Sequence, residues 1–298
     1  MLMRKLPITR ELPPVPAPLP GTMSITDKEF QAFRNLIFHE AGISLGDAKR
    51  ALVASRLARR LRHFGFTSYA QYYTYLTDQD PDGHERVQMV NCLTTNKTDF
   101  FREAHHSTFL REHVLPRLQE QVRQGAPSRL RFWSAGCSTG EEPYSLAMTV
   151  REALPSFANW DIRILASDID TSVLQTAERG IYAAARLEGV ADERQHRHFL
   201  RGRGEWAGTY QIKPELQQVI AFRRINLNEE PWPIRTRFHV IFCRNVVIYF
   251  NRETQRRLFE RFADALEPNG YLIVGHSEAL VGLSERFLPL RGSVHRLR

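Results

Sequence analysis

The chain has 298 residues, of which 42% are hydrophobic and 25% charged, and its formal net charge is +8. These values are typical of a globular protein large enough for two domains. No stretch approaches the roughly 18 consecutive apolar residues of a membrane-spanning helix, and the N-terminus lacks the apolar core of a signal peptide. The three cysteines have neither metal-ligand spacing nor a disulfide framework. These features predict a cytoplasmic protein without membrane insertion, and the charge favours a nucleic-acid or acidic-protein partner.

The N-terminal third divides into a tail and a helical domain. Residues 1–22 hold six of the sixteen prolines and show no helical or strand period, which predicts a disordered tail. Residues 23–93 show helical periodicity, first in "SITDKEFQAFRNLIFHEAGI" and then in "DAKRALVASRLARRLRHFGF". Two further helices are expected in "TSYAQYYTYLTDQD" and "HERVQMVNCLTTN", so this segment should form a small all-helical domain. One face of its second helix is apolar, with Val53, Leu57, Leu61 and Phe64.

Residues 94–298 should form an α/β domain. After a linker helix in "FLREHVLPRLQEQVRQG", strands alternate with helices, which favours a mostly parallel sheet covered on both faces. The alternation lapses at about 182–218, where the glycines of "FLRGRGEWAGTYQI" predict a small β insertion. "RFLPLRGSVHRLR" predicts a closing antiparallel hairpin turned at Gly292. The expected strands are 129–135, 161–167, 219–225, 238–243 and 271–275, and the expected helices are 142–154, 171–179 and 252–266.

The stretch "RFWSAGCSTGEEPYSLAM" reads as a strand, a glycine turn and a helix. Gly136 and Gly140 therefore lie where open α/β sheets bind ligands, beyond the carboxyl end of a strand. The turn has no Gly-Lys-Ser/Thr and no complete G-x-G-x-x-G pattern, so it is neither a P-loop nor a full dinucleotide fingerprint. Instead the helix opens with Glu141 and Glu142. Acids there stabilise a helix dipole, or they contact a ligand, and both interpretations remain open at this point.

An acid at the end of the next strand favours the ligand interpretation. "ILASDID" places Asp168 there, where a carboxylate commonly accepts hydrogen bonds from ribose hydroxyls. Asp170 is expected to cap the following helix. A ligand with a ribose, no phosphate and a cationic end would suit a glycine turn beside acids. S-adenosylmethionine has these properties.

Five motifs in order resemble the family of chemotaxis receptor methyltransferases, CheR. The resemblance runs from about residue 24 to the C-terminus. It implies a class I methyltransferase (Rossmann-like) fold behind the helical domain, and S-adenosylmethionine as cofactor with S-adenosylhomocysteine as product. It also implies methylation of glutamate side chains on the cytoplasmic helices of chemoreceptors. The motifs are "NKTDFFREAHH", "WSAGCSTGEEPYSLAM", "ASDIDTSVLQTAERGIY", "IFCRNVVIYF" and "GHSEAL".

The resemblance also implies which residues act in the site. Arg102 and Tyr249 would aim the substrate carboxylate at the methyl group. Without the family motifs, Arg102 would be interpreted as a surface charge and Tyr249 as a residue at the edge of the core. Glu141 would hold the amino-acid end of the cofactor, Asp168 the ribose, and Asn226 with Leu227 the adenine. The full set of implied cofactor contacts is Asn96, Thr98, Arg102, Gly136, Glu141, Asp168, Asn226, Leu227, Arg244 and Asn245.

This sequence departs from the usual patterns at three positions. Ser138 stands where glycine is usual in class I turns, and Ser134 where an acid often stands, which favours Glu141 as the source of charge. "GHSEA" replaces the more usual "GHSEN", which affects only a peripheral contact. His105 and His106 are assigned no role, and no metal is expected.

Two segments are expected to meet the receptor. The run from Lys49 to Arg62 contains six basic residues and no acid, so several should face outward together, as a solvated face or as a docking surface for an acidic helix. From this run Arg56, Arg59 and Arg60 are the predicted contacts. Gly202 and Gly204 resemble the Gly-x-Gly hairpin with which some family members bind a receptor's C-terminal pentapeptide, by strand addition. A monomer is expected.

Two other functions remain alternatives. A nucleic-acid methyltransferase would suit the charge, but the position after the fourth strand reads "NVVIY", without the prolines typical of amino-group enzymes on DNA. "FCRN" likewise lacks the Pro-Cys of cytosine-C5 enzymes, so no nucleic-acid partner is expected. A non-catalytic sensor or adaptor that binds the cofactor is the second alternative. Retention of Arg102, Asp168 and Tyr249 argues against it.

Overall fold

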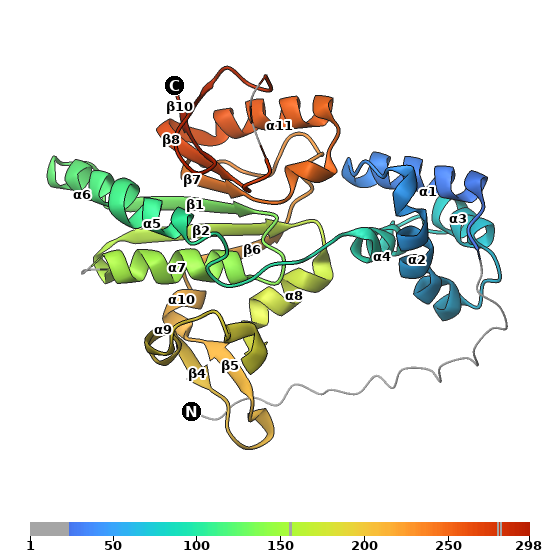
Figure 1. The fold of residues 1–298 in the computed structure, drawn as a ribbon, viewed down its shortest axis with the longest axis horizontal. Helices are drawn as coiled ribbons and strands as arrows, with labels where there is room; N and C mark the ends of the chain where they lie inside the picture. Colours follow the sequence, from blue (N-terminus) through green and yellow to red (C-terminus); the bar gives the residue numbers. More distant parts are fainter. Residues whose placement is uncertain (1–23, 155–156, 279, 281) are drawn as a thin grey trace. The chain divides into compact units, whose positions relative to one another are not determined.

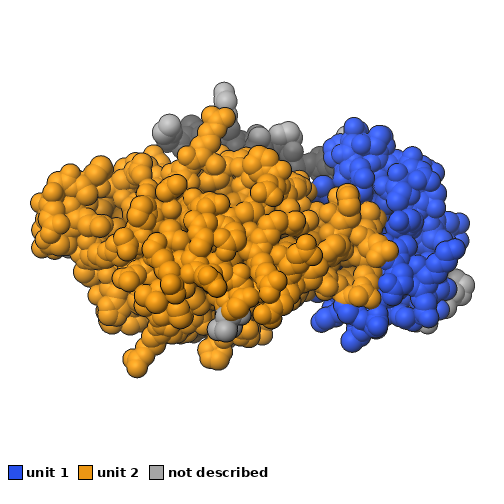
Figure 2. Space-filling model, turned by 90° about the horizontal axis from the view of Figure 1, so that it is seen from above, with its two compact units in different colours: residues 1–33, 46–93 blue, residues 34–45, 94–298 orange. Residues whose placement is uncertain are grey.

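The computed structural model describes residues 24–154, 157–278, 280 and 282–298. The expected proline-rich tail lies outside these residues. The chain separates into two compact units, the first with residues 1–33 and 46–93 and the second with residues 34–45 and 94–298. Figure 2 shows the two units in different colours. The domain boundaries proposed from the sequence stay predictions.

The first unit is all-helical, as predicted. It contains the first part of α1 (Asp27–Ala41), up to residue 33, followed by α2 (Arg50–Phe64), α3 (Tyr69–Asp78) and α4 (His84–Leu93), with a short 3-10 turn η1 (Asp47–Lys49) before α2. Buried aromatic and aliphatic side chains at helical spacing form its interior, because each helix has one apolar face. Val53, Leu57 and Leu61 are fully buried, as the sequence predicted.

Two of the basic residues on α2 have partners within the helical unit. Arg60 forms a bidentate ion pair with Glu85, in which Nε donates to Oε1 over 2.7 Å. The hydroxyl of Tyr72 donates to the same carboxylate. Arg56 donates to the carbonyl of Leu93 over 2.8 Å. Of the three arginines proposed to contact a receptor, only Arg59 is exposed to solvent, and the other two are half-buried. Lys49, Arg59 and Arg62 are exposed, so several basic residues do face outward, whereas Arg60 and Arg56 bind groups within their own unit; the three receptor contacts stay predictions.

The second unit is built on a seven-stranded sheet with the order β6-β2-β1-β7-β8-β10-β9. Its first five strands pair in parallel, and β10 and β9 close the edge in antiparallel fashion. This confirms the expected mostly parallel sheet and the terminal hairpin (Figure 1). The strands are β1 (Arg129–Ala135), β2 (Asp161–Asp168), β6 (Ile220–Arg224), β7 (Phe238–Cys243), β8 (Leu266–Val274), β9 (Phe287–Pro289) and β10 (Val294–Leu297).

Both faces of this sheet bury apolar side chains, because successive residues of a strand point to opposite sides. In β1, Phe132 enters the core beneath α7 (Glu141–Ala153) and α8 (Thr171–Arg179). Its neighbour Trp133 enters the core beneath α11 (Arg252–Ala265). Strands buried on both faces read as continuous apolar runs, which is why the sequence located them well. Figure 1 shows these helices on the two faces.

Two elements differ from their predicted form. The linker helix starts earlier and has three parts, α5 (His105–Phe109), a π-helical turn η2 (Leu110–Val114) and α6 (Leu115–Arg123). Pro116 lacks the N–H that an α-helix would use there, which gives a physical reason for the wider turn. β8 begins five residues before the predicted strand and contains an irregularity in its pairing with β7. "EPNG" within it reads as a turn from the sequence.

The insertion is larger than the predicted hairpin. It holds a three-stranded antiparallel sheet in the order β3-β5-β4. The glycines Gly202 and Gly204 lie in the connection between β4 and β5. The elements are β3 (Ile181–Ala183), the 3-10 turn η4 (Ala184–Leu187), α9 (Asp192–His198), β4 (Phe199–Arg201), the 3-10 turn η5 (Gly204–Trp206), β5 (Thr209–Ile212) and α10 (Pro214–Gln217).

The topology determines where a ligand can bind. The chain passes from β1 to β2 on one side and later returns to place β7 on the other side of β1. The carboxyl ends of these three strands therefore meet at the switch point of the sheet, where open α/β folds bind ligands. Among the described residues, no helix is long and apolar enough to cross a membrane.

We predict that Arg60→Ala lowers the free energy of unfolding of the helical unit by about 2–4 kcal/mol, because the buried Glu85 carboxylate loses its charge partner. This loss of stability is set below that of a fully buried ion pair, because the Arg60 side chain is 15% exposed. The neighbouring Arg59→Ala should change stability by less than about 0.5 kcal/mol. Chemical denaturation followed by circular dichroism measures both. Equal effects of the two substitutions would contradict the assigned ion pair.

Candidate active site

The turn between β1 and α7 requires glycine at two positions. Gly136 has a φ of 83°, and a Cβ there would lie 2.3 Å from Cγ2 of Val246. Gly140 has a φ of 97°, and a Cβ there would lie 2.9 Å from the hydroxyl oxygen of Tyr182. Both positions combine a left-handed backbone with contacts too close for a side chain. The glycines thus shape the turn, and a cofactor contact at Gly136 stays a prediction.

Ser138 also adopts a left-handed backbone, with a φ of 49°. This is the position where the sequence departs from the usual glycine. Its N–H donates to Oδ2 of Asp168 over 2.8 Å, and its hydroxyl donates to the carbonyl of Asn96 over 2.9 Å. These bonds offset the cost of about 1–2 kcal/mol that a non-glycine residue carries in this conformation.

Asp168 ends β2 directly beside the glycine turn. Its Oδ2 accepts the Ser138 N–H and its Oδ1 accepts the Asp170 N–H over 3.0 Å. The residue is 8% exposed. Burial raises the pKa of its carboxyl group to about 6, although the two backbone hydrogen bonds oppose the rise. A buried acid at this strand end fits the ribose acceptor that the sequence predicted.

Asp170 caps α8, as predicted. Its Oδ1 accepts the N–H of Ser172 over 2.8 Å, and its Oδ2 accepts from Nδ2 of Asn96 over 2.6 Å. The Asn96 amide therefore holds its own segment to the start of α8. Thr98, two residues later, accepts a hydrogen bond from Arg186 at its carbonyl oxygen over 2.7 Å. Roles for Asn96 and Thr98 as cofactor contacts stay predictions.

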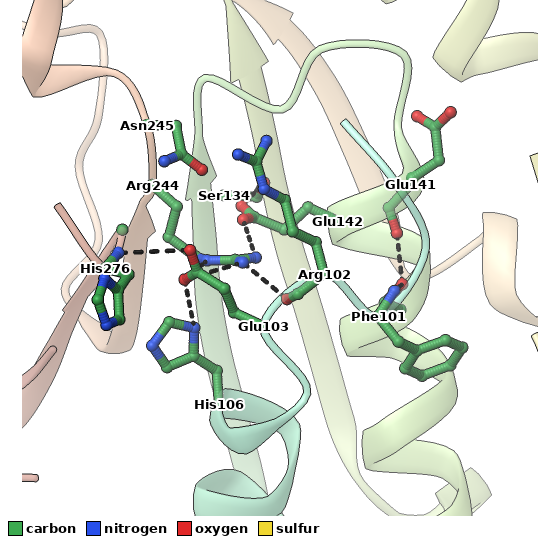
Figure 3. A network of polar contacts seen from close by, with 12 residues as sticks. Phe101, Arg102, Glu103, His106, Ser134, Glu141, Glu142, Arg244, Asn245 and His276 are labelled. Carbon is green, nitrogen blue, oxygen red and sulfur yellow. Dashed lines mark hydrogen bonds and ion pairs between the residues drawn. The ribbon is translucent and has the colours of Figure 1, made fainter. Parts of the chain in front are cut away.

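The two acids at the start of α7 have different partners. The Glu141 carboxylate accepts from Nε of Arg186 over 3.1 Å and from the Thr139 hydroxyl over 2.6 Å. The Glu142 carboxylate accepts from the Ser134 hydroxyl over 2.6 Å and pairs with Nη1 of Arg244 over 3.0 Å. In Figure 3 Glu141 points away from Arg244, whereas Glu142 points toward it. The cofactor contact expected for Glu141 stays a prediction, and Glu142 is the acid of this pair that contacts Arg244.

Arg244 connects three segments beyond the end of β7. Besides Glu142, its guanidinium binds Oε2 of Glu103, with Nη2 at 3.2 Å, and donates to the carbonyl of Arg102 over 2.7 Å. The residue is 9% exposed. Burial alone would raise the pKa of Glu103, but the Arg244 charge holds it below its ordinary value. Figure 3 shows this network, which the sequence did not predict because its members are far apart in the chain.

The loop after β7 is fixed by a buried acid. Asn245 has a φ of 58°, and its N–H donates to Oε2 of Glu278 over 2.7 Å. The same oxygen accepts the N–H of Gly275, and Oε1 accepts the N–H of Ile248 over 3.3 Å. Burial raises the pKa of Glu278. The glutamate of the "GHSEA" motif therefore joins the loops after β7 and β8, a role that the sequence analysis did not predict.

The two residues proposed to aim the substrate are both half-buried. Arg102 donates from Nη1 to the carbonyl of Lys97 over 2.9 Å, and its own carbonyl is bound by Arg244. Tyr249 ends the 3-10 turn η6 (Val247–Tyr249), and its carbonyl accepts the N–H of Ser44 over 2.8 Å. Arg102 thus lies in the Arg244 network. Tyr249 follows Asn245 on the loop that Glu278 holds, and the catalytic roles of both stay predictions.

Asn226 and Leu227 follow β6 and are buried. Nδ2 of Asn226 donates to the carbonyl of Glu40 over 2.7 Å and to Oε1 of Glu229 over 3.1 Å. β6 lies next to β2, and the N–H of Ile225 donates to the carbonyl of Asp168. The pair therefore lies close to the ribose acceptor along the sheet, as an adenine site would require.

The histidine pair binds the closing hairpin. Nε2 of His106 and Nε2 of His105 lie 2.9 and 3.2 Å from the carbonyl oxygen of Gly292. Burial lowers the pKa of His106 to about 4, so its ring is neutral. With Glu103 the pair forms a group whose side chains could hold a metal ion. These contacts give the pair a structural role, and no metal is assigned.

The connection between β4 and β5 also needs its glycines. A Cβ at Gly202 would lie 2.0 Å from the carbonyl oxygen of Trp206, and Gly204 has a φ of 58°. Turn geometry thus accounts for both residues. The connection also presents apolar surface, since Trp206 is 60% and Leu200 47% exposed.

Comparison with known proteins covers both units. Residues 28–94 match the family described as CheR methyltransferase, all-alpha domain, and residues 96–295 match CheR methyltransferase, SAM binding domain. Chemotaxis protein methyltransferase 2 of Pseudomonas aeruginosa is 45% identical over 271 residues, which cover 90% of this chain and 93% of the relative. The Escherichia coli chemotaxis protein methyltransferase is 41% identical, with 91% and 90% covered, and that of Borreliella burgdorferi is 34% identical, with 87% and 91% covered.

The family matches extend over most of both units and agree with the fold. The second unit has the class I methyltransferase architecture, and its cofactor is S-adenosylmethionine. This chain belongs to the CheR family of S-adenosylmethionine-dependent chemotaxis methyltransferases.

Proposed function

We propose that this protein transfers the methyl group of S-adenosylmethionine to glutamate side-chain carboxylates of chemoreceptors. The products are glutamate methyl esters and S-adenosylhomocysteine. The observation that carries the proposal is the excess of acid at the switch point, where Glu142 and Glu103 share the guanidinium group of Arg244 and the buried Asp168 binds two backbone N–H groups. Such a site attracts a cationic sulfonium and ammonium, whereas a phosphate would be repelled.

The residues of this structure fit the cofactor. The buried Asp168 carboxylate is proposed to accept hydrogen bonds from the ribose, and Asn226 with Leu227 to flank the adenine. Glu142 replaces Glu141 as the proposed ligand of the ammonium group, because the Glu141 side chain is only 1% exposed whereas that of Glu142 is 11% exposed. The remaining proposed contacts are Asn96, Thr98, Arg102, Gly136, Arg244 and Asn245.

The reaction needs little from the protein beyond placement of the substrate. When bound, S-adenosylmethionine supplies an electrophilic methyl group. A glutamate with an ordinary pKa of about 4.3 is ionised at neutral pH, so its oxygen is already nucleophilic and no general base is required. Arg102 can hold a carboxylate through two parallel N–H groups, and the Tyr249 hydroxyl can fix one oxygen. Together they would aim one substrate oxygen and keep it from water.

The proposed partners are the cytoplasmic domains of chemoreceptors. Arg59 is exposed on α2 and is free to face an acidic helix, which supports docking of that surface. The exposed Trp206 and Leu200 beside Gly202 and Gly204 support binding of a receptor pentapeptide at the insertion. We further propose that the enzyme acts as a monomer in the cytoplasm.

Methyl transfer to receptor-containing membranes should give alkali-labile methyl esters. We predict that Arg102→Ala lowers kcat/KM by about 100-fold, because the substrate carboxylate loses its aiming group. Tyr249→Phe should lower it by about 10-fold, since one hydrogen bond is lost. Arg123→Ala, in an exposed ion pair on α6, serves as the control and should leave the rate unchanged. Radiolabelled methanol released by alkali measures transfer.

Two outcomes would contradict this function, and a third would contradict the role of Arg102. Labelled nucleic acid without labile counts on receptors would indicate the nucleic-acid enzyme. Binding of S-adenosylhomocysteine without any transfer would indicate a sensor or adaptor. Normal activity in Arg102→Ala would show that the arginine does not aim the substrate.

Binding of S-adenosylhomocysteine should weaken below about pH 6, where the Asp168 carboxylate becomes protonated. Because the ionised form accepts from the ribose hydroxyls, affinity should fall about tenfold for each pH unit below this pKa. The effect on folding has the opposite sign, since a raised carboxyl pKa makes folding more favourable at low pH and less favourable as pH rises through about 6. Isothermal titration calorimetry measures the affinity. The affinity of Asp168→Asn should not change with pH. The same pH dependence in this variant as in the wild type would contradict the assignment.

A further inference from the structure

The segment that carries Arg102 has a strained backbone on both sides of this residue. Phe101 has a φ of 53° and Glu103 a φ of 56°. Neither is glycine, so each left-handed conformation is unfavourable and persists only where the surroundings hold it. On the C-terminal side Arg244 binds the Arg102 carbonyl and the Glu103 carboxylate. A hold is also needed on the N-terminal side.

Ser145 of α7 supplies part of that hold, because its hydroxyl accepts the N–H of Phe101 over 2.9 Å, and the β insertion supplies the rest. Arg186, in the 3-10 turn after β3, donates from Nη2 to the Thr98 carbonyl over 2.7 Å, and its Nη1 lies 3.8 Å from a carboxylate oxygen of Asp99. The ring of Phe100 packs edge-on against two aromatic rings of the insertion, Tyr182 at 5.0 Å and Phe199 at 5.5 Å. The insertion thus contacts three successive residues just before Arg102.

Arg186 also binds the start of α7, directly after the glycine turn. Its Nε and Nη2 bind Oε1 of Glu141, which is the first residue of α7 and is fully buried. Tyr182, four residues before Arg186, donates from its hydroxyl to the Thr139 carbonyl over 2.8 Å. Removing a carboxylate from water is costly unless it is paired, so Glu141 requires Arg186 nearby. Arg186 therefore bridges the start of α7 and the segment that leads to Arg102.

We infer that Arg186 is a positioning residue for methyl transfer, which fixes the Arg102 segment against α7 through the Glu141–Arg186–Thr98 bridge. The β insertion is then a structural part of the active site as well as the proposed receptor-binding element. This inference rests on the proposed function. It concerns placement of the substrate ligand Arg102, because Arg186 itself contacts other residues of the protein and none of the reacting groups.

The test compares four variants of the full-length protein. Arg186→Met removes the bridge but leaves Glu141 buried without its cation, so it also lowers stability. Arg186→Met with Glu141→Gln removes both charges and should restore stability. Arg186→Lys keeps a point charge beside Glu141 but lacks the planar fork that reaches Thr98 as well. Arg197→Met breaks an exposed Arg–Glu pair on α9 of the same insertion and serves as the control.

We predict that the double variant folds with a near-normal melting temperature but loses about 10- to 100-fold in kcat. Hydrogen exchange should show faster exchange of the amides of residues 98–103 in this variant, because the Arg186 bridge no longer holds this segment against α7. Arg186→Lys should recover only part of the activity, and Arg197→Met should match the wild type in both measurements.

Wild-type exchange and wild-type kcat in the folded double variant would overturn the inference. Full recovery of activity by Arg186→Lys would also overturn it, since charge compensation alone would then suffice. If the wild type forms no receptor methyl ester, the proposed function fails. Amide hydrogen exchange of residues 98–103 in the wild type and the double variant, measured with and without S-adenosylhomocysteine, then still decides whether Arg186 holds the segment.

Discussion

A single buried guanidinium group joins the parts of this active site. Arg244, at the end of β7, binds Glu103 before α5, Glu142 at the start of α7 and the carbonyl of Arg102. Charged groups removed from water are tolerated only when they are paired, so these segments are restricted to one arrangement. The acids outnumber their cationic partners. A glycine turn of this kind would otherwise suit a phosphate, and the excess negative charge makes it prefer a positively charged ligand.

Placement, rather than acid–base chemistry, is the main requirement of the proposed reaction. The substrate carboxylate is already ionised, so the rate depends on how well one oxygen is aimed. The structure meets this requirement with a rigid frame around Arg102, in which Arg244, Ser145 of α7 and the insertion hold the strained segment. Glu278 holds the loop that carries Tyr249 in a comparable way, because it binds the N–H groups of Asn245 and Ile248 there and that of Gly275 after β8.

Local patterns predicted the fold better than they predicted the site. Apolar runs, glycine turns and helix caps depend on neighbouring residues, so the strands, the Asp170 cap and the glycine turn were identified from the sequence. Partners far apart in the chain were not. Successive helical residues point about 100° apart, and only the fold shows that Glu142 faces Arg244 and Glu141 faces Arg186. Arg60 was assigned to the surface because its partner Glu85 is on another helix.

A crystal structure of the complex with S-adenosylhomocysteine would test the central claim most directly. The account predicts the ribose hydroxyls at the Asp168 carboxylate, the amino group at the Glu142 carboxylate, and an intact pair between Glu141 and Arg186. An amino group bound by Glu141, with the Arg186 pair broken, would contradict the assignment of the two acids. A ribose bound away from Asp168 would contradict the account of the site as a whole.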